Sequence, residues 1–180
     1  MENKEEKQNN IPRFSRTLPE TNNFSSEDAK FMQKAIDLSL ENVDKGGGPF
    51  GAVIVKNGEI ISTGTNRVVP ENDPTAHAEV KAIREACHKL GTFKLEGCTV
   101  YSSCEPCPMC LSALYWAGVS RICYGNTKED AKAIDFDDQF IYDQLELDYK
   151  DRSIKCDHFM GKKAITAFEK WDEKADKTKY

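Results

Sequence analysis

Apolar residues recur every three or four positions between Ser25 and Gly48. This apolar stripe consists of Met32, Ala35, Ile36, Leu40 and Val43. Such spacing is typical of one face of an α-helix. Ser25, followed three residues later by Asp28, matches a capped helix start, and the glycines at 46–48 are expected to end the helix. The pattern therefore predicts an amphipathic helix with one buried face.

The next segment, residues 51–68, has a different period. It contains two runs rich in β-branched residues, joined by Asn57-Gly58. This dipeptide tolerates the positive φ angles that a two-residue hairpin turn requires. Residues 51–68 are therefore predicted to form a β-hairpin.

Helical spacing returns at 76–91 through Val80, Ile83 and Cys87, with Asp73-Pro74 expected to cap this helix and supply its first-turn proline. The remaining pattern predicts strands at 98–103 and 121–125, a helix at 108–118, a short helix after Thr127 and a closing helix near 162–174. Strands that alternate with helices after an initial hairpin indicate an α/β fold, in which a mixed sheet lies between two layers of helices.

The composition is that of an ordinary globular protein, with 180 residues, 39% hydrophobic and 31% charged. Residues 1–24 are rich in Asn, Glu and Lys without a period, so they are predicted to be a flexible extension before a single domain at 25–180. A net charge of -5 disfavours nucleic acid as a partner and favours a small ligand. No apolar run is long enough for a bilayer, and the first residues lack the apolar core of a signal peptide; the protein is predicted to be cytoplasmic, without membrane contact.

Seven cysteines are present, and three of them fall within 104–110. Since nothing indicates secretion, metal binding is favoured over a disulfide framework. Two residues separate Cys107 from Cys110, which lets both thiolates bind one Zn²⁺, and His77 can supply a nitrogen ligand. Three protein ligands leave a fourth position for water, so the predicted cofactor is Zn²⁺.

Glu79 gives this predicted site a chemical role. Two thiolates and a neutral imidazole already balance the charge of Zn²⁺, and a nearby carboxylate can then take the proton of the water. Glu79 is interpreted as that base. The alternative is a structural zinc site with Cys104 as fourth ligand, which is less favoured because Cys104 ends a predicted strand, whereas closed sites usually pair two tight motifs.

The four other cysteines are predicted to be core thiols: Cys87, Cys98, Cys123 and Cys156. An apolar interior is the usual place for a free cysteine that binds no metal. These four cysteines are therefore not predicted to bind zinc.

Two short motifs carry a family resemblance. His77-Ala78-Glu79 and Pro106-Cys107-Pro108-Met109-Cys110 resemble the signature of the zinc-dependent cytidine and deoxycytidylate deaminases. Over a longer stretch, the chain is similar to the bacterial guanine deaminases in five segments: GGPFGAVIV, NDPTAHAEV, SSCEPCPMC, ALYWA and FDDQFIY.

The resemblance implies a three-layer α/β/α, cytidine-deaminase-like fold with a mixed central sheet of about five strands. It implies zinc bound by His77, Cys107 and Cys110. The implied reaction is hydrolytic deamination of guanine to xanthine and ammonia, with zinc-bound hydroxide as the nucleophile and Glu79 as the proton shuttle.

The resemblance also implies a set of substrate residues. Asn66 and Phe50 hold the base, the backbone at Ala78 faces it, and Trp116 and Asp138 border the pocket, with Asp138 placed beside Glu79 in the catalytic group. Guanine presents neighbouring N1–H and amino donors, which suit an Asp138 carboxylate. From the residues alone, other acidic residues of the DFDDQF segment are equally available, and both aromatic residues could be core packing.

For the assembly, the resemblance implies a homodimer whose C-terminal segments, about residues 150–180, are exchanged, so that Tyr180 closes the partner's active site. Three alternatives stay open. One is a deaminase of guanosine or another small amino-heterocycle, and a second is a transfer-RNA adenosine deaminase, with which both motifs are shared. The third is a zinc-stabilised interaction module without catalysis.

Overall fold

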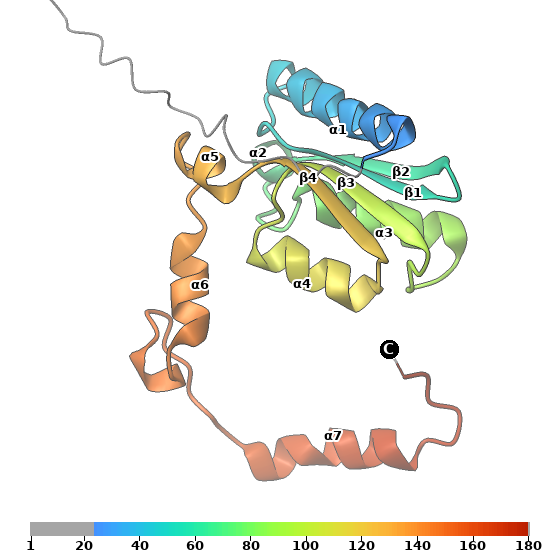
Figure 1. Ribbon diagram of the computed structural model, residues 1–180. Helices are drawn as coiled ribbons and strands as arrows, with labels where there is room; N and C mark the ends of the chain where they lie inside the picture. Colours follow the sequence, from blue (N-terminus) through green and yellow to red (C-terminus); the bar gives the residue numbers. More distant parts are fainter. Residues whose placement is uncertain (1–23, 180) are drawn as a thin grey trace, which may run out of the picture. The chain divides into compact units, whose positions relative to one another are not determined.

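The computed structural model describes residues 24–179, and the chain divides into two compact units, Met1–Asp138 and Gln139–Tyr180 (Figure 1). The predicted extension at 1–24 falls outside the described residues except for Phe24. The guanidinium carbon of Arg121 lies 5.6 Å from the centre of the Phe24 ring. The prediction of one domain at 25–180 stays a prediction, and the two units are described separately below.

A four-stranded mixed sheet forms the centre of the first unit. Its strands are β1 (Gly51–Lys56), β2 (Glu59–Thr65), β3 (Cys98–Cys104) and β4 (Arg121–Asn126), in the order β2-β1-β3-β4. β1 is antiparallel to both neighbours, whereas β3 and β4 are parallel. The expectation of about five strands is wrong for the described residues. After β4, Thr127 and Asp130 form a capping box that starts a helix, and no further β-rich run follows.

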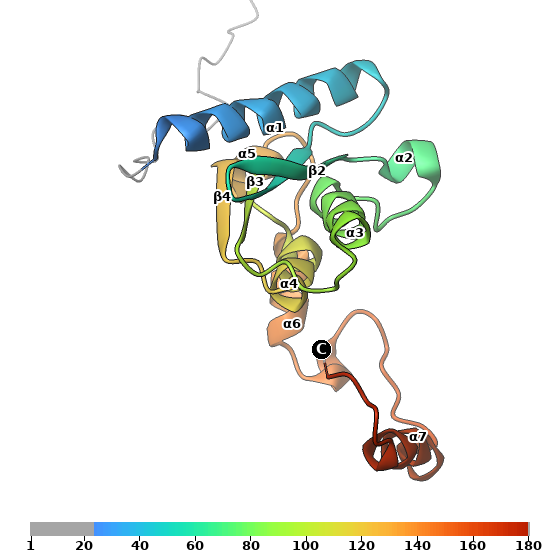
Figure 2. The ribbon, with the colours of Figure 1, turned by 90° about the vertical axis from the view of Figure 1, so that its right-hand side faces the viewer.

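Helices cover both faces of this sheet, which confirms the predicted three layers. α1 (Ser26–Asp44) lies on one face, and α3 (Ala78–Leu90) and α4 (Pro108–Ala117) lie on the other (Figures 1 and 2). Side chains that alternate along β1 and β3 enter two separate core clusters, as the two-residue period of a strand requires. The sheet is therefore buried on both sides.

Local sequence signals explain several elements. Ser25 and Asp28 form the expected capping box of α1. Asn57 and Gly58 both have positive φ, 52° and 78°, which confirms the predicted hairpin turn. Two short helices were not predicted, α2 (Val68–Glu71) and α6 (Gln139–Glu146). The predicted short helix after Thr127 is α5 (Lys128–Lys132).

The predicted start of α3 at Asp73-Pro74 is wrong. The helix begins at Ala78, and the Asp73 carboxylate instead accepts hydrogen bonds from the backbone N and the Oγ1 of Thr75, at 2.8 and 2.7 Å. A carboxylate that accepts these two hydrogen bonds within its own loop is not available to cap a helix further along the chain. Consequently His77 is the N-cap of α3 rather than a residue of its first turn.

A glycine brings α3 into backbone contact with β2. A Cβ atom at Gly64 would lie 2.0 Å from Ala78 O and 2.8 Å from Ala82 N. Only a residue without a side chain permits this approach. The Ser62 hydroxyl of the same strand also donates to Ala82 O at 2.7 Å. Gly64 therefore brings the first turn of α3 against the sheet, and the Ser62 contact lies about one turn further along the helix.

The second unit contains α6, a 3₁₀ turn at Tyr149–Asp151 and α7 (Gly161–Glu173). α7 agrees with the closing helix predicted near 162–174. Its apolar residues Ile165, Phe168 and Trp171 recur on one side and are 46%, 74% and 44% exposed. Cys156, expected in a core, is exposed. Among the described residues, no helix combines the length and apolar character that crossing a membrane would need.

Candidate active site

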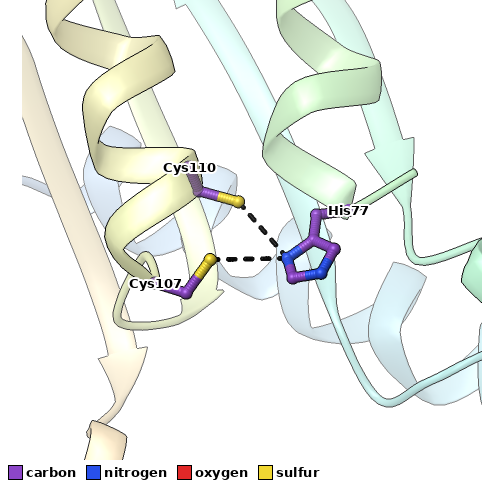
Figure 3. A group of neighbouring side chains, drawn as sticks. All are labelled: His77, Cys107 and Cys110. Carbon is purple, nitrogen blue, oxygen red and sulfur yellow. Dashed lines mark hydrogen bonds between the residues drawn. The ribbon is translucent and has the colours of Figure 1, made fainter. Parts of the chain in front are cut away.

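Two helix starts converge on one point between α3 and α4 (Figure 3). His77 is the N-cap of α3 and Cys107 is the N-cap of α4, each with extended backbone angles. Pro108 occupies the first turn of α4, where its missing N–H costs no hydrogen bond. Cys110 follows one turn later and is fully buried. The predicted facing of the two motifs is thus observed.

The three predicted zinc ligands lie together. His77 Nδ1 is 3.5 Å from Cys107 Sγ and 3.4 Å from Cys110 Sγ, and the ligand atoms all lie within 4.8 Å of one another. One imidazole and two thiols are a donor set that Zn²⁺ prefers, with a fourth position left open. Among the described residues, this is the group of side chains that could hold a metal ion.

Cys104 is outside this group. Its thiol donates to Thr127 O over 3.6 Å, and burial raises its pKa to about 12. Its sulfur is not among the ligand atoms of His77, Cys107 and Cys110 that lie within 4.8 Å of one another. The arrangement therefore favours a three-ligand site over a closed four-ligand site.

Contacts among the three candidate ligands shift their pKa values. The pKa of Cys107 is lowered, chiefly by its contact with the Cys110 thiol, while the same contact raises the pKa of Cys110. The hydrogen bond with Cys107 also raises the pKa of His77. Zinc binding requires both thiols to lose their protons.

Glu79 lies beside the three candidate zinc ligands but is not one of them. Its side chain is 6% exposed. Its Oε1 accepts a hydrogen bond from Ser102 Oγ at 2.9 Å, and its Oε2 accepts one from the Cys110 thiol at 3.3 Å. Burial raises the pKa of Glu79, which brings a carboxyl group nearer to the range where it can both accept and release a proton.

Two predicted substrate residues, Asn66 and Phe50, are neighbours. Asn66 is 7% exposed, and its Oδ1 accepts from Val68 N at 3.3 Å. A Cβ at Gly48 would lie 3.1 Å from Asn66 Oδ1 and 3.4 Å from Phe50 Cδ2. The absence of a side chain at Gly48 therefore leaves room between the amide and the ring.

Phe136 is a neighbour that the sequence did not indicate. Its ring stands edge-on to Phe50, with centroids 5.0 Å apart and planes at 86°. This is a favoured aromatic geometry. Its position two residues before Asp138, in a segment that returns to the site, was the available signal.

The three aspartates of the DFDDQF segment differ in their contacts and in their burial. Asp137 forms an ion pair with Lys132 at 2.9 Å, and Asp135 is exposed with a positive φ of 70°. Asp138 is half-buried; burial, and next the negative charge of Cys107, raise its pKa. The role predicted for Asp138 in substrate binding stays a prediction.

The remaining predicted residues differ in position. Ala78 is fully buried directly beside His77. Trp116 lies in the last turn of α4 and is 66% exposed; six residues of helix place it about 9 Å beyond Cys110 along the axis. Tyr180 lies outside the described residues. The roles predicted for these three residues stay predictions.

Comparison with known proteins decides the family. Residues 25–126 match the family model described as the cytidine and deoxycytidylate deaminase zinc-binding region. The chain belongs to this deaminase family. The matched zinc-binding region includes all three residues of the His77–Cys107–Cys110 group.

Within the family, both a curated relative and a solved structure that this chain resembles are guanine deaminase from Bacillus subtilis. The curated guanine deaminase of strain 168 is 46% identical over 151 residues, which is 83% of this chain and 97% of the relative. A crystal structure of guanine deaminase from Bacillus subtilis superimposes with a TM-score of 0.83 at 45% identity, covering 87% of this chain and 99% of the other. This chain is therefore a homologue of guanine deaminase over most of its length.

A transfer-RNA-specific adenosine deaminase of Aquifex aeolicus is equally similar over a shorter stretch. It is 46% identical over 94 residues, which is 52% of this chain and 62% of the relative. The zinc-binding portion is thus common to both kinds of deaminase, whereas the similarity to guanine deaminase extends further along the chain.

Proposed function

We propose that this protein deaminates guanine hydrolytically, giving xanthine and ammonia. The supporting observation is a buried Glu79 beside the His77–Cys107–Cys110 group, in a chain that is similar to guanine deaminase over 83% of its length. The reaction adds water at C2 of the purine and releases the amino group as ammonia. Zinc, when bound, acts as a Lewis acid that makes water a nucleophile near neutral pH.

The residues of the chain divide the remaining work. His77, Cys107 and Cys110 hold the metal ion. Glu79 accepts a proton from the attacking water at its carboxylate and passes it to a ring nitrogen. It then takes a second proton from the hydroxyl added at C2, which becomes the carbonyl, and delivers that proton to the departing amine. Its raised pKa suits a group that must both take up and release a proton in one cycle.

Substrate recognition is assigned to groups around the same point. The Asn66 amide can donate and accept hydrogen bonds to the base, and the Asp138 carboxylate accepts from the paired donors on the guanine edge. Phe50 contacts the purine ring, supported by the edge of Phe136. The backbone at Ala78 faces the base, and Trp116 borders the pocket.

Guanine is preferred over the alternative substrates for two reasons. The similarity to guanine deaminase covers 83% of the chain, against 52% for the transfer-RNA adenosine deaminase. The formal net charge is -5, which does not favour a long phosphate backbone as a ligand. A non-catalytic zinc module does not need a buried carboxyl group at Glu79, because burying it carries a desolvation cost.

The deciding experiment offers guanine, guanosine, cytosine and adenine separately to the zinc-loaded protein and measures ammonia. Guanine is expected to release ammonia at a rate well above the other three. A separate incubation with transfer RNA tests the RNA-editing alternative, which ammonia release from the RNA, with guanine untouched, would favour. Exclusive release from guanosine or cytosine would also exclude the proposal.

The proposed assembly is a homodimer with exchanged C-terminal segments. Its support is the apolar stripe of α7, in which Ile165, Phe168 and Trp171 are partly or largely exposed in the single chain. Such a stripe normally packs against another surface, and a second copy is the proposed partner. Tyr180 would then close the partner's site. Sedimentation of the full-length chain should give twice the mass of the 20.3 kDa monomer.

The cytoplasm is the proposed location. All seven cysteines are free, and Cys107 and Cys110 must stay reduced to bind zinc. A reducing compartment meets this requirement.

A further inference from the structure

Ser102 is a polar side chain in an apolar row of the sheet. Side chains on one face of β3 alternate along the strand, so Ser102 shares its face with Cys98 and Val100. Both are fully buried in the cluster against α3 and α4. The residue paired with Ser102 on β1, Ala52, is also fully buried. Ser102 itself is 1% exposed.

A hydroxyl in such a place needs a hydrogen-bond partner, because burying it unpaired costs about 1–3 kcal/mol. The partner is Glu79, whose Oε1 lies 2.9 Å from Ser102 Oγ. An apolar residue would fill this position without that requirement. Ser102 therefore pairs with a carboxylate that also contacts Cys110 of the metal group, and this pairing indicates a role in the reaction.

We infer that Ser102 is a positioning residue that holds the Glu79 carboxylate with Oε1 turned to the sheet and Oε2 turned to the metal group. The inference rests on the proposed deamination. Oε2 lies 3.3 Å from Cys110 Sγ, so it is the oxygen on the side where water and the leaving amine react. Ser102 does not touch the substrate; it acts through Glu79.

Metal binding makes this role more important. Without a metal, Glu79 receives side-chain hydrogen bonds from both Ser102 and Cys110. When Cys110 binds zinc as a thiolate, it no longer has a proton to donate. Of these two contacts, the Ser102 hydrogen bond is the one that remains to orient the carboxylate during turnover.

The chain offers a matched control in Ser62. Its hydroxyl is also buried, with 5% of the residue exposed, and donates to Ala82 O of the same helix at 2.7 Å. Ser62→Ala therefore removes a buried serine hydrogen bond to α3 without touching Glu79. If Ser102 only stabilised the helix against the sheet, Ser102→Ala and Ser62→Ala would behave alike.

The experiment measures kcat and KM for guanine, zinc per chain and Tm in wild type, Ser102→Ala, Ser62→Ala, Glu79→Gln and the Ser102→Ala/Glu79→Gln pair. Ser102→Ala should lower kcat about 10- to 100-fold with KM nearly unchanged and zinc retained. Ser62→Ala should keep the wild-type kcat. In single turnovers, Ser102→Ala should add no further loss to Glu79→Gln, because the group it positions is already gone. A crystal structure of zinc-loaded Ser102→Ala should show the Glu79 carboxylate rotated.

Three results would overturn the positioning role: a wild-type kcat in Ser102→Ala, an additive loss in the double variant, or a fall in kcat that matches lost zinc. These are distinct from failure of the proposed function. If the wild-type protein itself releases no ammonia from guanine, the deamination proposal fails, and the role of Ser102 fails with it.

Discussion

Gly64→Ala tests how closely the zinc site depends on the contact between α3 and β2. The added Cβ would lie 2.0 Å from Ala78 O, so relieving it to an ordinary contact near 3.4 Å requires a shift of about 1.4 Å. Ala78 lies between His77 and Glu79, and both move with it. Zinc ligands tolerate displacements of only about 0.2 Å from their bond lengths.

Two effects are expected in Gly64→Ala. Overpacking at this buried position should destabilise the fold by about 1–3 kcal/mol, which lowers Tm by about 2–12 °C in a chain of this size. Displacement of His77 should weaken zinc binding by on the order of 10- to 100-fold. Chelator competition measures the affinity, and thermal unfolding measures the stability.

Gly51→Ala is the matched control. A Cβ at Gly51 would lie 2.4 Å from Ala35 O and 2.8 Å from Ser39 N, so it produces a similar clash against α1 on the opposite face of the sheet. It should lower Tm and leave zinc affinity unchanged. Equal zinc affinity in Gly64→Ala and wild type, or equal loss in both glycine variants, would refute the reasoning.

Three further predictions concern single features. Glu79→Gln should reduce ammonia release about 10²- to 10⁴-fold with zinc retained, while exposed Glu71→Gln should not; normal turnover in Glu79→Gln would contradict the proton-shuttle role. A hydrogen bond from Tyr101 is the main cause that lowers the pKa of Asp28 below its ordinary 3.8. The stabilising contribution of Asp28 is therefore complete above that pH and is lost progressively as the pH falls from 3.8 toward the lowered pKa of the folded state. Asp28→Asn should therefore be less stable than wild type at pH 7 by about 1–2 kcal/mol, in urea unfolding, with a smaller difference at pH 3; a constant difference would disprove the linkage. Deleting Lys177–Tyr180 should lower turnover with zinc retained, and co-expression with Glu79→Gln should restore part of it, since a mixed dimer has one site with both parts; an unaffected rate in the deletion would remove Tyr180 from the site.

Predictions that depended on neighbouring residues in the chain agree well with the structure. Asn57-Gly58 forms the expected turn, and Ser25 with Asp28 forms the expected capping box. Pro108 begins α4. These signals act over a few bonds, so the surrounding fold has little influence on them. The prediction at Asp73 was wrong because its carboxylate could either cap a helix or accept a hydrogen bond within its own loop. It accepts from Thr75.

Predictions that required knowledge of a distant partner were incomplete. Phe136 contacts Phe50 across 86 positions of the chain, and Ser102 on β3 donates a hydrogen bond to Glu79 on α3. Neither residue belongs to a spacing pattern. The choice of Asp138 over its acidic neighbours likewise depended on a family resemblance, and its role stays a prediction.

The sequence by itself determined the order of most helices and strands and the identity of the metal-binding side chains, because capping, period and the Cys107–Cys110 spacing are local properties. The tertiary structure decided which of those side chains act together. Close contact of α3 with Gly64 sets where His77 and Glu79 stand, and β3 supplies the hydroxyl that orients the carboxylate. Such arrangements depend on contacts between distant segments, which form only when the sheet and its two helical layers pack.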